Sequence, residues 1–530
     1  MALGCAPKTE PTHPAGTSSE LVTRDDARRR LAALAVDYEA LMRAHGEHEW
    51  SRYAGKLAEG PEAQRSMAEL RAKERDLFLE AERVLDHFGS GVISPRQDAL
   101  WKSGALGLKL LGDPRAAELA DALEATINDH RFVLDGKTLS RGELTALRYS
   151  EDPSARRRVR QLEHELHRRA APIAVELLQR RHALAQELGL PSFYSALLEL
   201  RGVAQQRLGA LLGELSALTL SAYLKLHRAL RVAQGGRLIA VWDLDFALRR
   251  LHRPPEERFT AEGALPFARA LFGAFGVDLD KPRVDVTVRD FAFSGQAISV
   301  EVPNDVRLVV TPQPGSRFYG TLIHELGHAF AATRTRPENP LYAGYEWVPG
   351  LSDPGFAEGL AEVFGRLLDE PRVLRELVGL DATEAERLIA ARRADGMVRV
   401  ARGLQSVTFE RAALEQPGQD LDQLSLALEG RFTGAFLPPG TEPVWATSPF
   451  LSTYPVYTHA YLLAAMFAVQ VRDALKQRFG ERWISPDAGN HLAETLIADG
   501  ARWTLDEKLV RGTGSILTAQ AFAHFLNGAS

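Results

Sequence analysis

Two histidines and a glutamate in the stretch TLIHELGHAF, residues 321–330, have the types and spacing of a metal site. Residues four apart share one face of an α-helix, so His324 and His328 can both present imidazole nitrogens to one ion. Zinc binds such nitrogens and keeps one position for water in catalytic sites. Glu325 is rotated away from His324 around the helix, where its carboxylate can act as a general base on that water.

The His-Glu dipeptide occurs three times in the chain, but only His324 is followed by a histidine four residues later. No second histidine follows His48, and His167 comes only three residues after His164, in a charged helix. The alternative interpretation of the stretch is a helix with two histidines in the protein core. A third ligand on another segment would favour the metal site.

The segment SDPGFAEGLAEVFGRLLDE, residues 352–370, offers such a ligand. Asp353 and Pro354 are typical of a helix start, and Glu358 and Glu362 then lie four apart on one face. Two acids on an otherwise apolar helix are costly to bury unless their charge is compensated. We predict Glu358 as the third zinc ligand and Glu362 as the carboxylate that accepts the N–H of a zinc-bound histidine. Two surface acids are the alternative.

A third segment clusters aromatic residues at the head of an apolar helix, in FLSTYPVYTHAYLLAAMF from Phe450. Peptide hydrolysis by an attacking water produces an oxyanion that needs hydrogen-bond donors, and a phenol donates without carrying a charge. The candidates are Tyr454, Tyr457, His459 and Tyr461. Aromatic packing explains the cluster equally well, and the sequence does not say which of these residues contacts a substrate.

The elements that must position these residues are mostly helical. Residues 21–279 show apolar residues at i, i+3 and i+4 spacing, and the pattern is helical again after residue 311. Between them, RVDVTVRDF, AISVEV and VRLVVT alternate or are β-branched, as strands are. We therefore predict a mainly α protein with one small β-sheet next to the histidine helix. We expect a single catalytic domain over 21–530, with a helical part at about 21–280 and a zinc-site part at about 281–530.

The composition is that of a soluble globular protein, with 530 residues, 25% charged residues and a formal net charge of −5. The chain contains no long basic block, which argues against nucleic acid as a partner. It also contains no apolar run long enough for a transmembrane segment.

The one cysteine, Cys5, lies in ALGCAPKTEPTHPAGTSSE. This stretch resembles the cleavage box and linker of a bacterial lipoprotein, and the arginine-, alanine- and leucine-rich composition fits a bacterial source. We expect residues 1–20 to be either such a linker, with a lipid anchor at Cys5, or a disordered tail. The location is accordingly the cell envelope or the cytoplasm.

HELGHAF and DPGFAEGLAEVF together resemble the zinc oligopeptidases of the thimet oligopeptidase and angiotensin-converting enzyme type, within the gluzincins. By this resemblance His324, His328 and Glu358 bind Zn²⁺ and Glu325 is the base. Tyr461 falls where the family has its transition-state tyrosine, and Tyr454 where oligopeptidases have a substrate tyrosine. The resemblance also implies a two-lobed helical shell around a deep cleft, with an extended peptide pairing with the edge of a strand, for which VRLVVT is the candidate.

The predicted function is therefore a zinc metallopeptidase that hydrolyses short unstructured peptides by Glu-assisted attack of zinc-bound water. We expect a monomer whose partner is the oligopeptide substrate. The lysine with which peptidyl-dipeptidases hold a terminal carboxylate has no clear match, so endopeptidase and dipeptide release both stay open. The alternative is a non-catalytic binding or scaffold protein with a structural metal on the same fold.

Overall fold

The structure, a computed structural model, describes residues 23–53, 61–139, 141–279, 284–289, 294–313, 315–452 and 454–528. The predicted N-terminal linker and its Cys5 lie outside these residues. Nothing in the described part tests the predicted domain boundaries. None of its helices combines the length and the apolar character that crossing a membrane requires.

The first half of the described chain is helical, as predicted, with one two-stranded hairpin formed by β1 (Val133–Leu134) and β2 (Lys137–Thr138). Proline at the first helical turn after an aspartate or serine cap starts several of these helices. The helices are α1 (Arg24–Tyr53), α2 (Pro61–Phe88), α3 (Pro95–Leu111), α4 (Pro114–Asp129), α5 (Arg141–Arg148), α6 (Pro153–Glu187), α7 (Phe193–Leu200), α8 (Gln205–Ala233), α9 (Leu244–His252) and α10 (Ala261–Ala274).

A three-stranded sheet follows at the predicted position and is formed by β3 (Val284–Val288), β4 (Gly295–Glu301) and β5 (Asp305–Val310). The strand order is β3-β5-β4, with β3 parallel and β4 antiparallel to β5. The VRLVVT strand is therefore the central strand, and our prediction that its edge receives a peptide is wrong. Because β5 is paired on both sides, the edges of the sheet belong to β3 and β4.

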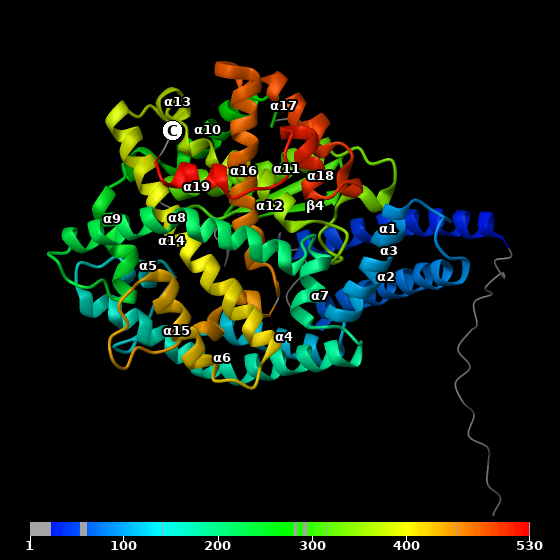
Figure 1. Ribbon diagram of the computed structural model, residues 1–530, viewed down its shortest axis with the longest axis horizontal. Coiled ribbons are helices and arrows are strands. Elements are labelled where there is room, and N and C mark those ends of the chain that lie inside the picture. The colour runs from blue at the N-terminus through cyan, green and yellow to red at the C-terminus, as the bar shows by residue number, and fades with distance from the viewer. Residues whose placement is uncertain are drawn as a thin grey trace, which may run out of the picture.

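After the sheet the chain is again helical. The helices are α11 (Ser316–Arg334), α12 (Pro354–Gly365), α13 (Pro371–Val373), α14 (Ala382–Glu415), α15 (Leu421–Thr433), α16 (Thr458–Phe479), α17 (Pro486–Leu492), α18 (Leu505–Thr513) and α19 (Gln520–Leu526). Figure 1 shows α1 and α2 projecting to one side, and α14 and α16 running between the layer that contains α6 and α15 and the layer that contains α17–α19.

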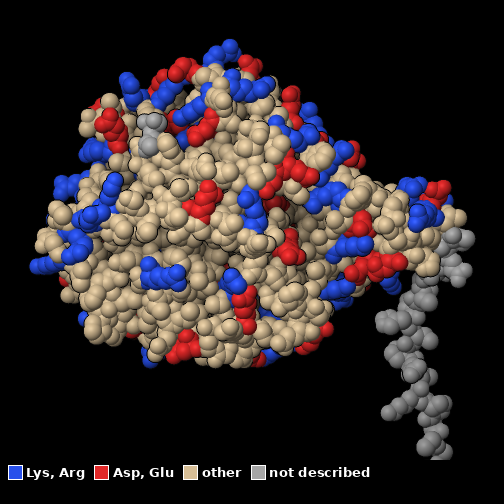
Figure 2. Space-filling model, in the orientation of Figure 1, with Lys and Arg blue, Asp and Glu red and all other residues tan. Residues whose placement is uncertain are grey.

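The predicted fold class is confirmed: the protein is mainly α, and the sheet packs against α11. One large core joins the helices of both layers, and a separate cluster holds α1, α2 and α3 against residues 341–351. Lys/Arg and Asp/Glu side chains are mixed over the face seen in Figure 2. Helix α16 contributes an almost completely buried face from Leu462 to Val471, which places its head in the interior of the molecule.

Candidate metal centre and active site

The histidine helix α11 is packed so tightly on α12 that no side chain fits between them at one position. A Cβ atom at Gly327 would lie 2.7 Å from the Cα of Ala361 in α12. The two backbones can approach this closely because residue 327 is glycine. The close approach brings the inward faces of α11 and α12 together, and those faces carry His324, His328 and Glu358.

Helix α12 starts as the sequence predicts. The Asp353 side chain accepts a hydrogen bond from the Phe356 N–H at 3.1 Å, and Pro354 occupies the first turn. The start of the helix sets the direction in which Glu358 points, one turn further on. Glu358 is buried, with 7% of its surface exposed, although it is a carboxylate on an apolar helix.

His324, His328 and Glu358 converge on one point. Each offers a ligand atom, and these atoms all lie within 4.8 Å of one another. The His324 Nε2 atom is 3.3 Å from Glu358 Oε2, and the two imidazole centroids are 5.0 Å apart. Two imidazoles and one carboxylate are the ligand set of catalytic zinc sites that leave a fourth position to water.

Two further observations show that a divalent cation fits this point. Apart from the His324 Nε2 atom at 3.3 Å, the buried Glu358 Oε2 atom has no partner among the residues that the structure describes, although such an atom normally forms a hydrogen bond. Burial opposes a charge on His324, yet Glu358 and Glu362 outweigh it and raise the pKa of this histidine well above its usual value. The surroundings therefore favour a positive charge here. His328 has its pKa lowered to about 4, mainly by burial, so this imidazole is neutral, as a metal ligand must be.

Glu325 lies beside this point and is 8% exposed. The pKa of its carboxyl is raised to about 7, mainly by burial and also by Glu358, whereas His324 and the backbone N–H of Ala297 in β4 act in the opposite direction. A Cβ atom at Gly295 would lie 2.9 Å from Glu325 Cγ, so the start of β4 leaves room for this side chain. The edge strand next to the predicted base is thus β4, and the position of Glu325 there suits proton transfer.

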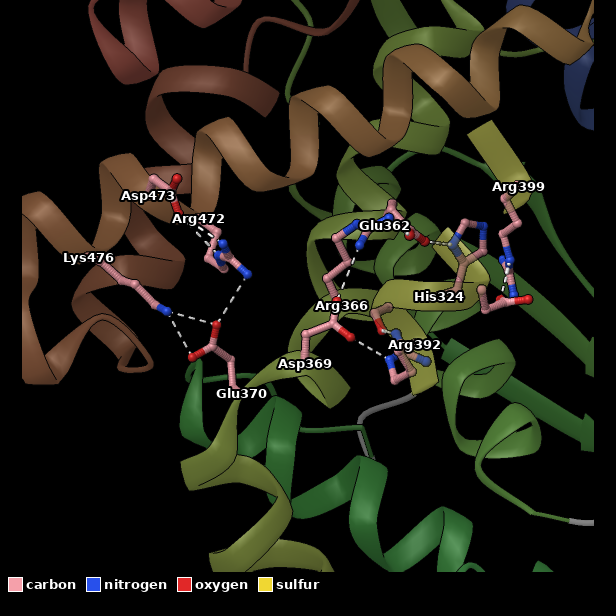
Figure 3. A network of polar contacts seen from close by, with 12 residues as sticks. His324, Glu362, Arg366, Asp369, Glu370, Arg392, Arg399, Arg472, Asp473 and Lys476 are labelled. Carbon is pink, nitrogen blue, oxygen red and sulfur yellow. Dashed lines mark hydrogen bonds and ion pairs between the residues drawn. The ribbon is translucent and has the colours of Figure 1, made fainter. Parts of the chain in front are cut away.

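Behind His324 lies a set of charged side chains that we call the ion-pair network (Figure 3). Its members are Glu362, Arg366, Asp369 and Arg392. Glu362 Oε2 is 3.6 Å from His324 Nδ1, and its other oxygen is 3.1 Å from Arg366 Nη2. Arg366 and Arg392 both pair with Asp369, and Arg392 also donates to the Gly365 carbonyl.

The structure places Glu362 where the sequence predicts it, next to the ring nitrogen of His324 that faces away from Glu358. The contact of Arg366 with Glu362 was not predicted, although the spacing of four residues indicates that the two side chains can pair. Asp369, three residues after Arg366, was missed in the same way, whereas Arg392 carries no local signal because it comes from α14.

We call residues 449–452 and 454–457, which precede α16, the tyrosine loop. Its last residue, Tyr457, donates a hydrogen bond from its hydroxyl to Glu358 Oε1 at 2.9 Å. Tyr457 is 8% exposed, so it orients the metal-ligand carboxylate from the interior. The hydrogen bond to Oε1 leaves Oε2 as the oxygen that faces the histidines.

Tyr461 and Tyr454 both contact Tyr457, with ring centroids 5.7 Å and 5.8 Å from its ring. Tyr461 is 44% exposed and Tyr454 46%, yet burial raises the pKa of both phenols, that of Tyr454 to about 12. The pKa of Tyr461 is raised by both Glu358 and Glu325, whereas the acid with the largest effect on the pKa of Tyr454 is Glu346.

The remaining predicted residue, His459, lies in the interior at the head of α16. It is 1% exposed, its Nε2 has no hydrogen-bond partner, and burial lowers its pKa to about 3. Its other contact is with the backbone of Val456. In this position the imidazole is a buried neutral group at the head of α16, out of reach of a substrate.

Three charged side chains hold the tyrosine loop through its backbone. Arg181 donates to the carbonyls of Leu451 and Ser452, and Arg201 donates to that of Pro455 at 3.0 Å. Glu410 accepts the N–H of Val456, whose φ of +56° is unfavourable for a β-branched residue. None of the three was predicted from the sequence, because they come from α6, the end of α7 and α14, which are far from the loop in the chain.

No protein-family model matches the chain, and no curated protein sequence matches it. Solved structures do match. A Pyrococcus furiosus carboxypeptidase matches with a TM-score of 0.64 at 14% identity, covering 95% of this chain and 98% of its own.

Two further solved structures match this chain to a similar extent. The M32 carboxypeptidase from Deinococcus radiodurans has a TM-score of 0.60 at 16% identity, with 95% and 98% of the two chains covered. The Trypanosoma cruzi metallocarboxypeptidase 1 has a TM-score of 0.60 at 16% identity, with 96% and 99% covered. The resemblance to thimet oligopeptidase and angiotensin-converting enzyme is thus supported only at the coarser level of metallopeptidase structures. Over almost its whole length, this chain has the fold of the metallocarboxypeptidases.

Proposed function

We propose that this protein is a zinc-dependent peptidase that acts on short peptides. The observation that carries the proposal is the convergence of His324, His328 and Glu358 with a fourth side chain, Glu325, that is not needed as a ligand. A purely structural metal site closes its coordination with protein ligands and has no use for a base beside it. The matching structures are carboxypeptidases, which supports peptides as the substrate class.

Zn²⁺ at these ligands would supply the Lewis-acid chemistry that lowers the pKa of water and polarises a peptide carbonyl. Glu325 then accepts the proton of the attacking water and returns it to the amine that leaves. Tyr461 donates a hydrogen bond to the carbonyl oxygen as negative charge develops on it. Tyr457 and Glu362 act on the ligands, since they hold the carboxylate of Glu358 and the ring of His324.

The test is hydrolysis of a mixed library of short unlabelled peptides by the full chain, with products identified by mass spectrometry and zinc measured in the same sample. We expect cleavage that stops with a chelator and returns with added zinc. We also expect Glu325→Gln to abolish cleavage while the protein keeps its zinc. Peptide binding without turnover in the zinc-loaded wild type would instead support a binding or scaffold protein.

A further inference from the structure

Helix α8 has an exposed apolar face on the outside of the molecule. Its inner side packs on α9 and α14, where Leu226 and Leu230 are buried. On its outer side Leu220 is 54% exposed, Leu224 50% and Val232 77%. Positions four apart share one face of a helix, so these three side chains belong to one continuous surface. Large apolar side chains that gather on a surface in this way mark an interaction site.

The apolar surface continues past the end of the helix. Leu238 is 55% exposed, and Phe436, from the segment that follows α15, is 42% exposed. The Phe436 N–H donates to the Ile239 carbonyl at 2.7 Å, and Tyr223 of α8 donates to the Thr433 carbonyl at 2.7 Å. These two hydrogen bonds place Phe436 next to the residue after Leu238, and they place its segment beside α8.

Exposed basic side chains lie among these apolar residues. None of them forms an ion pair with a described residue, although Arg207 at the start of the same helix pairs with Asp506. The chain contains no aspartate or glutamate over 215–242 or 430–441, so no acid within these segments balances the positive charge. The basic residues are Lys225, Arg228, Arg231, Arg237 and Arg431. Together with Leu220, Leu224, Val232, Leu238 and Phe436 they form what we call the α8 surface.

The chemistry of the α8 surface favours one kind of partner. A second copy of this chain that docked through the same surface would bring five positive charges against five, which is unfavourable. Nucleic acid offers phosphates to the basic side chains but little apolar surface to the leucines. The interface of an anionic lipid layer satisfies both, because the acyl chains take up apolar side chains while the headgroups attract lysine and arginine.

We propose that the α8 surface docks the protein on an anionic lipid surface, with α8 lying in the plane of the interface. In this orientation the leucines enter the acyl boundary, and the long basic side chains extend to the headgroups. The inference goes beyond the proposed function and does not rest on it, because the metal ligands belong to α11 and α12. It is also independent of the expected lipid anchor at Cys5, which lies outside the described residues.

The experiment measures sedimentation of the full chain with vesicles of phosphatidylcholine, and with vesicles of the same size that also contain phosphatidylglycerol. All proteins carry Cys5→Ser, so that no acyl chain at this position contributes. We expect a partition coefficient at least roughly 10²-fold higher for the anionic vesicles, with a steep decrease as salt is added. Equal partition onto both kinds of vesicle, or none onto either, would overturn the proposal.

Charge variants test whether the α8 surface makes the contact. Each basic side chain close to a membrane contributes roughly 5-fold, so the double variant Arg228→Gln, Arg231→Gln should lower partition onto anionic vesicles roughly 30-fold. The matched control is Arg71→Gln, Arg83→Gln in α2, which removes the same charge and should leave partition unchanged. Arg83 and Arg228 each donate from Nε to the backbone carbonyl four residues earlier, at 3.3 Å.

The control also lies away from the proposed contact, since Figure 1 shows α2 on the opposite side of the molecule from α9, which follows α8. An equal loss of partition in the two double variants would mean that only net charge matters. The assignment to the α8 surface would then be wrong.

Apolar variants separate a lipid surface from other anionic partners. The double variant Leu220→Gln, Leu224→Gln keeps every charge and should lower partition roughly 10-fold, because less apolar area enters the lipid. Unchanged partition would mean that the surface only attracts anions, and the lipid proposal would fail. It would also fail if the wild type forms a dimer in analytical ultracentrifugation that dissociates in this variant, since a second copy would then cover the surface. Thermal unfolding verifies that each variant is folded.

Discussion

The ion-pair network behind His324 and the tyrosine loop in front of it are both fixed by buried charges, but in different ways. In the network, each arginine meets a carboxylate, and Glu362, Arg366 and Asp369 follow one another within 3.3 Å. The loop is held instead by charges that bind backbone groups, with Arg181 and Glu410 as examples. Within the part of the chain that the structure describes, neither charge forms an ion pair, and burial shifts their pKa, to about 10 for Arg181 and about 7 for Glu410.

The difference assigns separate tasks to the two regions. A compensated network changes little with pH or ligand, so it suits the constant orientation of a metal ligand. A loop held by charges without an ion-pair partner is sensitive to charge nearby, and it carries Tyr454 and Tyr457, which contact each other and, through Tyr457, the ring of Tyr461 in α16. We therefore expect substitutions of the residues around the tyrosine loop to affect turnover. Substitutions in the ion-pair network should affect metal affinity.

The largest effect on turnover should come from Glu325, which lies on α11 beside the metal ligands. Glu325→Gln removes the base but keeps the shape of the side chain, so hydrolysis should fall by up to about 10⁴-fold. Zinc content should stay at the wild-type level, because Glu325 is not one of the converging ligands. Metal analysis and peptide hydrolysis on the same sample check this. Loss of zinc together with activity would mean that Glu325 is a ligand and not the base.

The next largest effect on turnover should come from Tyr461, and a comparison with Tyr454 tests which phenol acts. Tyr461→Phe removes a donor near Glu358 and Glu325, and kcat should fall by about 10²-fold with little change in zinc affinity. Tyr454→Phe is the matched control, because this equally exposed phenol senses Glu346 in place of the two site carboxylates. Its kcat should fall much less. A larger loss for Tyr454→Phe would exchange the roles of the two tyrosines.

The pH dependence of stability tests how the loop is held. The pKa of Glu410 is raised from 4.5 to about 7. Burial raises it, whereas the Val456 N–H, Arg201 and Arg181 act in the opposite direction. The folded state therefore holds a proton that the unfolded state releases between these pH values, so this group costs stability as the pH rises.

Relative to Glu410→Gln, the wild type should lose up to about 3 kcal/mol of unfolding free energy between pH 4.5 and 7. Urea unfolding of both proteins across this range measures it. Glu415→Gln, on the same helix and paired with Arg411 near the surface, is the matched control variant. A wild type that gains stability over this range would contradict the assignment.

The smallest effect on turnover should come from the ion-pair network. Glu362→Gln weakens the contact with His324 Nδ1, and the zinc dissociation constant should rise roughly 10–100-fold. At saturating zinc, kcat should stay near the wild-type value. A competition titration with a chromogenic chelator measures the affinity, with the exposed pair member Glu376 (Glu376→Gln) as control. A large loss of kcat at saturating zinc would remove the distinction between the two regions.

Local periodicity predicted what lies on single helices. His324, His328, Glu358 and Glu362 follow from i, i+4 spacing and from the cost of burying acids, and the structure brings all four together. The three strands were likewise visible as β-branched runs at nearly the observed bounds. In each case the signal comes from neighbours within a few residues in the sequence.

What depends on distant partners was not predictable. The order β3-β5-β4 needs a parallel pairing between strands that are not adjacent in the chain, which placed the predicted edge strand in the centre. His459 looked like its tyrosine neighbours, and only packing turns it into the interior. Arg201 is an ordinary arginine at a helix end until the tyrosine loop, some 250 residues later, folds against it.

The close contact at Gly327 also has a kinetic consequence. Helix α11 alone carries two imidazoles, while the carboxylate arrives only when α12 docks on the bare backbone at this glycine. During refolding, tight ion uptake should therefore begin only at the docking step, so a metal-sensitive dye in a stopped-flow instrument would time the assembly of these two helices.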